Sequence, residues 1–197
     1  MEREFTLGID IDGTVTDPFT FIPHLNQYFK QNFKMEDITT YDILKIYHIT
    51  EEEYEKWHSK YGASVYQNAP LAKDAKEVLL DLQKNYRLIY ITARSEEYRE
   101  PTMKWFESNQ IPFDRVVMTG NAFKCDQAIK YQVDLFLEDH YDAARTMGQK
   151  LQIPILLFDT PYNQGQLPNN VIRIHSWKEA KRIIDQYAQN KRLRKNP

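Results

Sequence analysis

The sequence predicts an α/β protein with a doubly wound parallel sheet and a small helical cap inserted after the first strand. The apolar, β-branched run at residues 5–11 is typical of a buried strand, and Gly13 after it supplies a turn. From residue 74 onward, helical and strand patterns alternate with the spacing of right-handed βαβ units. Such alternation favours a mainly parallel sheet with helices on both faces.

The segment after the first strand shows no strand alternation. Residues 14–23 are expected to form a loop, and residues 36–67 are acidic and aromatic with a capped helix start at Thr50. The insertion is either a subdomain packed on its own aromatic residues or a lid over a substrate crevice, and its position favours the lid. We therefore predict two parts: an α/β core of residues 1–16 and 70–197, and a helical cap of residues 17–69.

Hydrophobic periodicity predicts the remaining elements in order. Helices are expected at residues 24–30, 74–85, 95–108, 121–131, 141–150 and 177–189. Strands are expected at residues 87–91, 115–118, 133–137, 153–158 and 171–174. Parallel strands share the edge at which their carboxyl ends meet, and ligands bind there. The strand ends bring to this crevice the polar residues Asp10, Asp12, Thr92, Glu138 and Asp139.

The composition is that of one globular domain with room for a small insertion. The 197 residues are 42% hydrophobic and 27% charged, with a formal net charge of −2. This balance favours neither a nucleic acid polymer nor a membrane as partner, and the basic residues 191–195 are expected to form a solvated terminus. No apolar segment approaches about 18 residues, and a single cysteine, Cys125, excludes an internal disulfide. The expected compartment is the cytoplasm.

The polar residues at the strand ends suit phosphoryl transfer. A phosphate ester repels an anionic nucleophile, so a site for its transfer needs a cation and hydrogen-bond donors. Mg²⁺ binds through a few carboxylates plus water, and Asp10 and Asp139 with the backbone carbonyl of Asp12 would suit it. One carboxylate could then attack phosphorus while a second carries protons to the leaving group and from water.

The order of these residues resembles that of the haloacid dehalogenase-like superfamily of phosphatases. The string Asp10-Ile-Asp12-Gly-Thr14-Val15 looks like the first motif of that superfamily. The strand end at Thr92 resembles the second motif, Lys124 the third, and Glu138-Asp139 the acidic fourth. The resemblance covers about residues 5–158 and implies the same α/β core.

The resemblance also implies a role for each motif residue. Asp10 would be the nucleophile and a metal ligand, and Asp12 the general acid and base with its carbonyl on the metal. Thr92 and Lys124 would hold the phosphoryl group. Asp139 would complete the Mg²⁺ site.

Three features leave alternatives open. Glu138 stands where many members have aspartate, so it would bind the metal, orient a water or tune Asp139, and Asp142 is the competing ligand. Arg94 would bind the phosphate or the nucleotide, or pair with the neighbouring acidic residues 96 and 97. Some aromatic residues of the cap would stack on a base or fill the core of the cap: Phe19, Phe21, Tyr41, Trp57 and Tyr66.

Shorter strings narrow the resemblance to the 5′(3′)-deoxyribonucleotidases and related bacterial nucleotidases. They are Ala69-Pro-Leu-Ala, Thr92-Ala-Arg94 and Phe158-Asp-Thr-Pro-Tyr-Asn163. They imply a magnesium-dependent phosphomonoester hydrolase, a nucleotidase that forms an aspartyl-phosphate from a nucleoside (deoxy)monophosphate. The alternatives are hydrolysis of another small phosphorylated metabolite, phosphotransferase or phosphonatase chemistry on the same core, and non-catalytic nucleotide binding. The expected partner is a small phosphate ester, and a homodimer is left open.

Overall fold

A six-stranded, all-parallel sheet forms the centre of the computed structural model, which describes residues 5–121 and 124–195. Across the sheet the strands follow the order β3 (Arg115–Met118), β2 (Arg87–Thr92), β1 (Thr6–Ile9), β4 (Leu135–Glu138), β5 (Ile155–Phe158) and β6 (Val171–Ile174). The order reverses beside β1, which pairs with β2 on one side and β4 on the other. In a doubly wound sheet this switch point is where ligands bind. The predicted fold class is confirmed.

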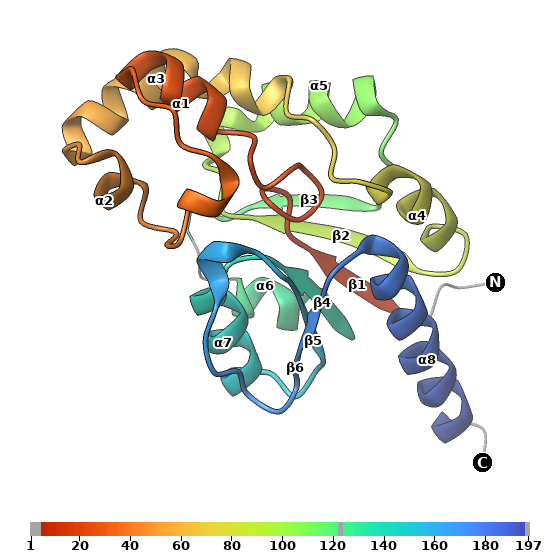
Figure 1. Ribbon diagram of the computed structural model, residues 1–197. Helices are drawn as coiled ribbons and strands as arrows, with labels where there is room; N and C mark the ends of the chain where they lie inside the picture. Colours follow the sequence, from red (N-terminus) through yellow and green to blue (C-terminus); the bar gives the residue numbers. More distant parts are fainter. Residues whose placement is uncertain (1–4, 122–123, 196–197) are drawn as a thin grey trace.

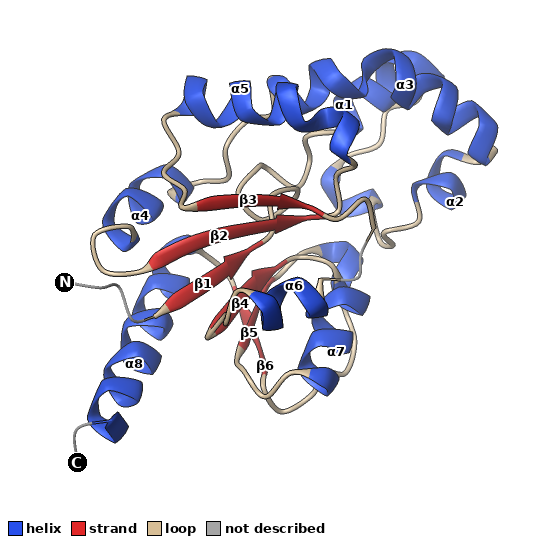
Figure 2. Ribbon diagram, turned by 180° about the vertical axis from the view of Figure 1, so that it is seen from behind, coloured by secondary structure: helices blue, strands red, loops and turns tan. Residues whose placement is uncertain are grey.

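Helices cover both faces of the sheet, as Figures 1 and 2 show. On one face lie α4 (Ala75–Leu82), α5 (Arg99–Asn109) and α8 (Trp177–Lys195), whose buried side chains share a cluster with Leu7, Tyr90 and Leu137. On the other face lie α6 (Cys125–Lys130) and α7 (Tyr141–Lys150), which share a cluster with Ile91 and Phe136. The apolar sheet is therefore shielded on both sides, as parallel strands require.

A helical insertion lies between β1 and α4, at the top of Figure 1. It contains α1 (Ile22–Phe29), a 3₁₀ turn at Met35–Asp37, α2 (Ile43–Tyr47) and α3 (Glu51–Gln67). It has its own apolar cluster, which includes the buried Trp57, and α3 packs against α5 of the core. An antiparallel bridge between Thr16 and Leu71 joins its two ends. These features support, as a proposal, the division into a core of residues 1–16 and 70–197 and a cap of residues 17–69.

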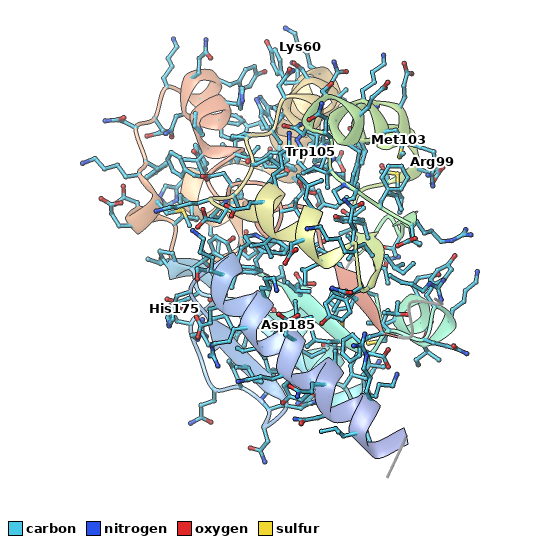
Figure 3. The ribbon with its side chains drawn as sticks, turned by 90° about the vertical axis from the view of Figure 1, so that its right-hand side faces the viewer. Lys60, Arg99, Met103, Trp105, His175 and Asp185 are labelled. Carbon is cyan, nitrogen blue, oxygen red and sulfur yellow. The ribbon has the colours of Figure 1, made fainter. Side chains whose placement is uncertain are left out.

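Trp105 of α5 anchors the contact between that helix and the insertion's exit. Its side chain is fully buried, and its indole N–H donates a hydrogen bond to the carbonyl of Ala69 at 2.7 Å. Figure 3 shows Trp105 on the inner side of α5, whereas Arg99 lies at the outer end of the same helix. This hydrogen bond fixes α5 of the core to Ala69, the last residue of the insertion.

Several element ends differ from the sequence prediction. Helix α1 begins at Ile22 rather than residue 24, because Pro23 is tolerated in a first turn, where its missing N–H is not needed. Strand β1 ends at Ile9, since the chain then turns on the Ile11 carbonyl, which accepts the N–H groups of Val15 and Thr16 at 2.9 Å. Helix α6 begins at Cys125, and residues 122 and 123 of the predicted helix lie outside the described part.

The basic tail, which the sequence predicts to be a solvated terminus, is helical, and Arg192 and Leu193 within it are exposed. Helix α8 continues to Lys195, and the ammonium of Lys191 forms an ion pair with Asp134 and lies 5.7 Å from the centre of the Phe5 ring. Periodicity weakens after residue 189 because most of the last residues of α8 are charged. Among the described residues, no helix combines the length and the apolarity that crossing a membrane would require.

Candidate active site

Three neighbouring strand ends place the predicted site residues at one edge of the sheet. Asp10 directly follows β1, Thr92 ends β2, and Glu138 ends β4 and is followed by Asp139. The side chains of these residues are almost completely buried. The structure brings these residues together at one edge of the sheet because the three strands are parallel and adjacent.

The acidic residues surround one buried lysine. Carboxylate oxygens of Asp10, Glu138 and Asp139 lie within 4.8 Å of one another. The ammonium of Lys124, at the start of α6, lies 2.7 Å from Asp10 Oδ1 and 2.8 Å from Glu138 Oε2. Three carboxylates and one ammonium leave an excess of negative charge when all are ionised.

The pKa values of Asp10 and Asp139 are raised in this buried, negatively charged group. Burial raises the pKa of Asp10 to about 7, against the opposing effect of Lys124. Burial and the charges of Glu138 and Asp10 raise the pKa of Asp139 well above its usual range. Burial alone would lower the pKa of Lys124, but the carboxylates of Asp10 and Glu138 outweigh it and raise that pKa. Oxygen ligands with uncompensated negative charge in a buried group are the donor set that Mg²⁺ binds, so the residues fit this cation.

Glu138 is engaged on both oxygens. Oε2 accepts from Lys124, and Oε1 accepts the backbone N–H groups of Asp139 at 3.1 Å and His140 at 3.0 Å. Asp142, the competing ligand in the sequence analysis, is exposed on α7 and is not in the group of clustered carboxylates. The geometry therefore ties Glu138 to Lys124 and to the backbone after β4.

Residues from the loop after β5 orient Asp139. The hydroxyl of Tyr162 donates to Asp139 Oδ2 at 2.6 Å, and Asn163 Nδ2 donates to the Asp139 carbonyl at 2.7 Å. Thr14 Oγ1 donates to Oδ1 at 3.4 Å. Sequence reasoning assigned no role to Tyr162 or Asn163, although both lie in the string 158–163 that carries part of the resemblance.

Gly13 makes the close approach of the β1 loop to Asp139 sterically possible. Its φ of +76° is unfavourable for other residues, and a Cβ atom there would lie 2.1 Å from Asp139 Oδ2. The glycine that the sequence analysis interpreted as a turn residue therefore also leaves room for a carboxylate.

Asp12 turns away from the acidic group and pairs with Arg94. Arg94 Nε donates to Asp12 Oδ2 at 2.9 Å, and a terminal nitrogen donates to Oδ1 at 2.7 Å. Arg94 Nη1 also donates to Thr102 Oγ1 of α5 at 3.0 Å. The alternative pairing of Arg94 with residues 96 and 97 is wrong, because Glu96 pairs with Arg99 and Glu97 accepts from Ser95. Thr92 Oγ1 accepts the backbone N–H of Arg94 at 3.3 Å.

A cavity of about 610 Å³ opens above these carboxylates, between the insertion and the core. Asp12, Arg94, Asp139 and Tyr162 line it from the core. Several carboxylates line it as well: Asp17, Asp42, Glu51 and Glu55. The insertion therefore encloses the space into which the site opens, as expected of a lid.

The aromatic residues of the insertion lie in its own cluster, at the cavity or, in the cases of Phe21 and Tyr54, at both. Trp57 is buried in the insertion's own cluster, and Phe19 packs against that cluster. Phe21, Tyr41 and Tyr66 line the cavity. Tyr54, which lies one turn before Trp57 and His58 on α3, lines it too, although it was not among the residues proposed to stack on a base.

Solved structures share the fold. A hydrolase described as a haloacid dehalogenase-like family protein from Streptococcus pneumoniae superposes with a TM-score of 0.66 at 16% sequence identity. The match covers 93% of this chain and 99% of that protein. At this level of identity the likeness concerns the fold, which is the haloacid dehalogenase-like α/β fold with its helical insertion.

Curated relatives are similar along nearly the whole chain. A "Putative nucleotidase" of Halalkalibacterium halodurans is 40% identical over 189 residues, which are 96% of this chain and 97% of the relative. A nucleotidase of Clostridium acetobutylicum is 35% identical over 183 residues, 93% of this chain and 95% of the relative. The profile of the family "5' nucleotidase, deoxy (Pyrimidine), cytosolic type C protein" matches residues 3–191. The chain thus belongs to this nucleotidase family of phosphomonoester hydrolases.

Proposed function

We propose that the protein is a magnesium-dependent phosphatase that hydrolyses nucleoside (deoxy)monophosphates through an aspartyl-phosphate on Asp10. The observation that carries this proposal is the position of Asp10. Its carboxylate lies at the carboxyl end of β1, between the Lys124 ammonium and two further carboxylates, at the switch point of the sheet. Family membership supports the substrate class.

The cation would be held by Asp10, Asp139 and the backbone carbonyl of Asp12. When bound, Mg²⁺ would neutralise charge on the phosphoryl oxygens. Glu138 is proposed to support the metal site rather than to bind the metal directly, because Oε1 already accepts two backbone N–H groups and Oε2 pairs with the Lys124 ammonium. Asp139, in contrast, accepts one hydrogen bond on each carboxylate oxygen from the described residues. Tyr162 and Asn163 hold Asp139 in place for the same purpose.

Each half of the reaction uses Asp10 and Asp12 in different ways. One oxygen of Asp10 attacks phosphorus, the phosphorus–oxygen bond of the ester breaks, and protonated Asp12 gives its proton to the leaving oxygen. Ionised Asp12 then takes a proton from a water molecule as that water attacks phosphorus. The bond to Asp10 breaks, and inorganic phosphate leaves. Lys124 and Thr92 are proposed to bind the phosphoryl oxygens during both steps.

The cavity is suited to a nucleoside. Its volume of about 610 Å³ falls within the usual range of about 300–1,000 Å³ for small-ligand pockets. The rings of Phe21, Tyr41, Tyr54 and Tyr66 line it, and aromatic rings stack on bases with an energy of about 1–3 kcal/mol per base. The proposed substrate therefore places its phosphate at Asp10 and its base among these rings.

Turnover of nucleoside monophosphates with and without Mg²⁺ tests the proposal. Purified protein is expected to release phosphate from deoxynucleoside monophosphates, and excess EDTA is expected to lower the rate by at least about 100-fold. Added Mg²⁺ should restore the rate after EDTA. A set of phosphorylated sugars and acids serves as the comparison, and higher kcat/KM on those compounds would contradict the assignment to nucleotides. Undiminished turnover in EDTA would contradict the metal requirement.

The charge of the cavity predicts a preference for one phosphate group. Asp17, Asp42, Glu51 and Glu55 line the cavity, and Arg94 is already paired with Asp12. Among the described residues that line the cavity there is no lysine and no second arginine, so a second or third phosphate would meet mainly negative charge, which is unfavourable. We expect kcat/KM for a nucleoside monophosphate to exceed that for the triphosphate by about 100-fold or more.

Charge reversal at Glu51 and Glu55, the two glutamates at the rim of the cavity, tests this preference. The double variant Glu51→Lys, Glu55→Lys is expected to lower the ratio of kcat/KM for the monophosphate to kcat/KM for the triphosphate by about tenfold at low salt. The change should be smaller at high salt, because Glu51 and Glu55 are exposed and salt screens their charges. Glu52→Lys is the matched control, since Glu52 is exposed on the same helix but does not line the cavity. An equal effect of the control would contradict a local role of the rim.

The remaining expectations concern the cell and the assembly. The family description refers to a cytosolic type, which supports the cytoplasmic location that we propose. A homodimer stays a prediction, and light scattering on the purified protein measures it directly.

A further inference from the structure

Arg94 is a buried cation that donates hydrogen bonds to the carboxylate of Asp12. None of its side chain is exposed to solvent, whereas the side chain of Asp12 is 24% exposed at the base of the cavity. Both oxygens of Asp12 accept from the guanidinium, in the bidentate geometry that fixes a carboxylate plane. Each oxygen has a second lone pair, so Asp12 keeps acceptor sites for a proton from the cavity.

The guanidinium is itself held from two sides. Arg94 Nη1 donates to Thr102 Oγ1, which is fully buried on α5. The ring of Tyr66, on α3 of the insertion, lies with its centre 4.1 Å from the guanidinium carbon. An arginine that packs against a ring and donates a hydrogen bond from each of its three side-chain nitrogens has few ways to turn, because a planar fork with fixed partners loses its rotamer freedom.

Tyr66 is fixed in turn by contacts that span the cavity wall. Its hydroxyl lies 3.1 Å from His58 Nε2 within the insertion, and His58 Nδ1 lies 3.1 Å from the hydroxyl of Tyr98 in the core. A continuous series of contacts therefore runs from Asp12 through Arg94 and Tyr66 to His58 and Tyr98. The position of the insertion and the orientation of Asp12 are linked by these side chains.

We propose that Arg94 is a positioning residue that holds the Asp12 carboxylate in place for proton transfer to the leaving oxygen, and that Tyr66 holds Arg94 there. The role rests on the proposed function, in which Asp12 is the proton carrier. It differs from direct phosphate binding, because the bonds from Nε and Nη2 to Asp12 and from Nη1 to Thr102, with the Tyr66 ring on one face, leave little of the guanidinium for a substrate.

This role predicts a dependence on the leaving group. The alkoxide of a nucleoside is a poor leaving group and needs a proton in the transition state, whereas 4-nitrophenolate leaves without one. A residue that only positions the acid should therefore matter for nucleotides and matter little for 4-nitrophenyl phosphate. The quantity to compare is kcat/KM, since it reports the steps up to cleavage of the ester and not the later hydrolysis on Asp10.

The test measures kcat/KM for both esters in Arg94→Ala and Arg94→Lys. Arg94→Ala is expected to lose about 100-fold on a nucleoside monophosphate and less than about fivefold on 4-nitrophenyl phosphate, with Arg94→Lys between it and the wild type. Equal losses on both esters would overturn the role and favour direct phosphate binding. No loss on either ester would overturn it as well. Absence of turnover by the wild-type protein would overturn the proposed function, and this role with it.

A double-variant cycle separates positioning from structural damage. Asp12→Asn should also lose more kcat/KM on the nucleotide than on 4-nitrophenyl phosphate. Adding Arg94→Ala to it should not increase that difference between the two esters, because both changes act on one proton transfer. Additive losses would contradict the proposal. Thr102→Val keeps Arg94 and removes one of its hydrogen-bond acceptors. It should therefore show the same leaving-group dependence of kcat/KM with a smaller loss on the nucleotide, and it can be measured even if Arg94→Ala fails to fold. Arg99→Ala is the matched control, since Arg99 pairs with Glu96 on the outer side of the same region (Figure 3).

Discussion

Asp10→Asn is expected to lower phosphate release by at least about 10⁴-fold, the largest effect of any single substitution in the site. An amide is not a nucleophile towards phosphorus, and it also weakens the binding of a cation. The measurement is kcat for a nucleoside monophosphate in saturating Mg²⁺. Retained turnover above about 1% of the wild-type rate would contradict an aspartyl-phosphate on this residue.

The same variant should not be less stable than the wild type when metal is absent. Burial raises the pKa of Asp10 to about 7, so the ionised side chain is disfavoured in the folded protein near neutral pH, and a neutral amide removes that penalty. We expect the Tm of Asp10→Asn in EDTA to equal or exceed that of the wild type at pH 7. Loss of activity with retained Tm then reports on the site and not on damage to the fold.

Asp142→Asn is the control for this experiment. Asp142 is a nearby carboxylate on α7, exposed and outside the acidic group. Activity within about twofold of the wild type is expected, since surface substitutions rarely change more than local charge. A large loss in Asp142→Asn would restore it as a metal ligand.

Lys124→Met is expected to have the largest effect on stability, about 3–5 kcal/mol in the free energy of unfolding. Lys124 is 3% exposed and its ammonium contacts both Asp10 and Glu138, so its removal leaves two buried carboxylates without their cation. Urea denaturation in EDTA measures the loss. The rate of turnover should fall by at least about 10³-fold as well, because the ammonium is proposed to stabilise the charge of the phosphoryl group.

A second substitution distinguishes charge from packing. Glu138→Gln added to Lys124→Met removes one of the two buried carboxylates that have lost their cation, and it should recover part of the lost free energy of unfolding. Lys130→Met, at the exposed end of the same helix, should cost less than about 0.5 kcal/mol. If Lys124→Met proved as stable as Lys130→Met, the buried ion pairs would not support the fold.

Positions in the core could be predicted from the sequence because parallel strands impose strong rules. Once residues 5–11 and 133–137 are taken as parallel strands, the residues at and just after their carboxyl ends must lie at the same edge of the sheet, and Asp10 and Asp139 do so. The end of β2 brings Thr92 there for the same reason. Hydrophobic periodicity and topology together therefore determine where the acidic residues meet.

Side-chain partners could not be predicted in this way. Arg94 lies close in sequence to Glu96 and Glu97, yet it pairs with Asp12, because Thr102 and Tyr66 fix its direction from α5 and α3. The partner of a buried charge depends on tertiary packing, for which local sequence gives no signal. Tyr162 was missed for the same reason, since only the fold of the loop after β5 brings its hydroxyl to Asp139.

The bridge between Thr16 and Leu71 has a consequence for protein engineering. Because it joins the entry and exit of the insertion, the segment between them can change length or sequence without separating the two halves of the sheet. A short turn in its place would leave every strand connection as it is, while removing Tyr41 and Tyr66 from the cavity. A chimera that carries a different insertion on this core should therefore acquire a different choice of ester, and it should keep the phosphate chemistry if the new insertion again places an aromatic ring against Arg94, as Tyr66 does.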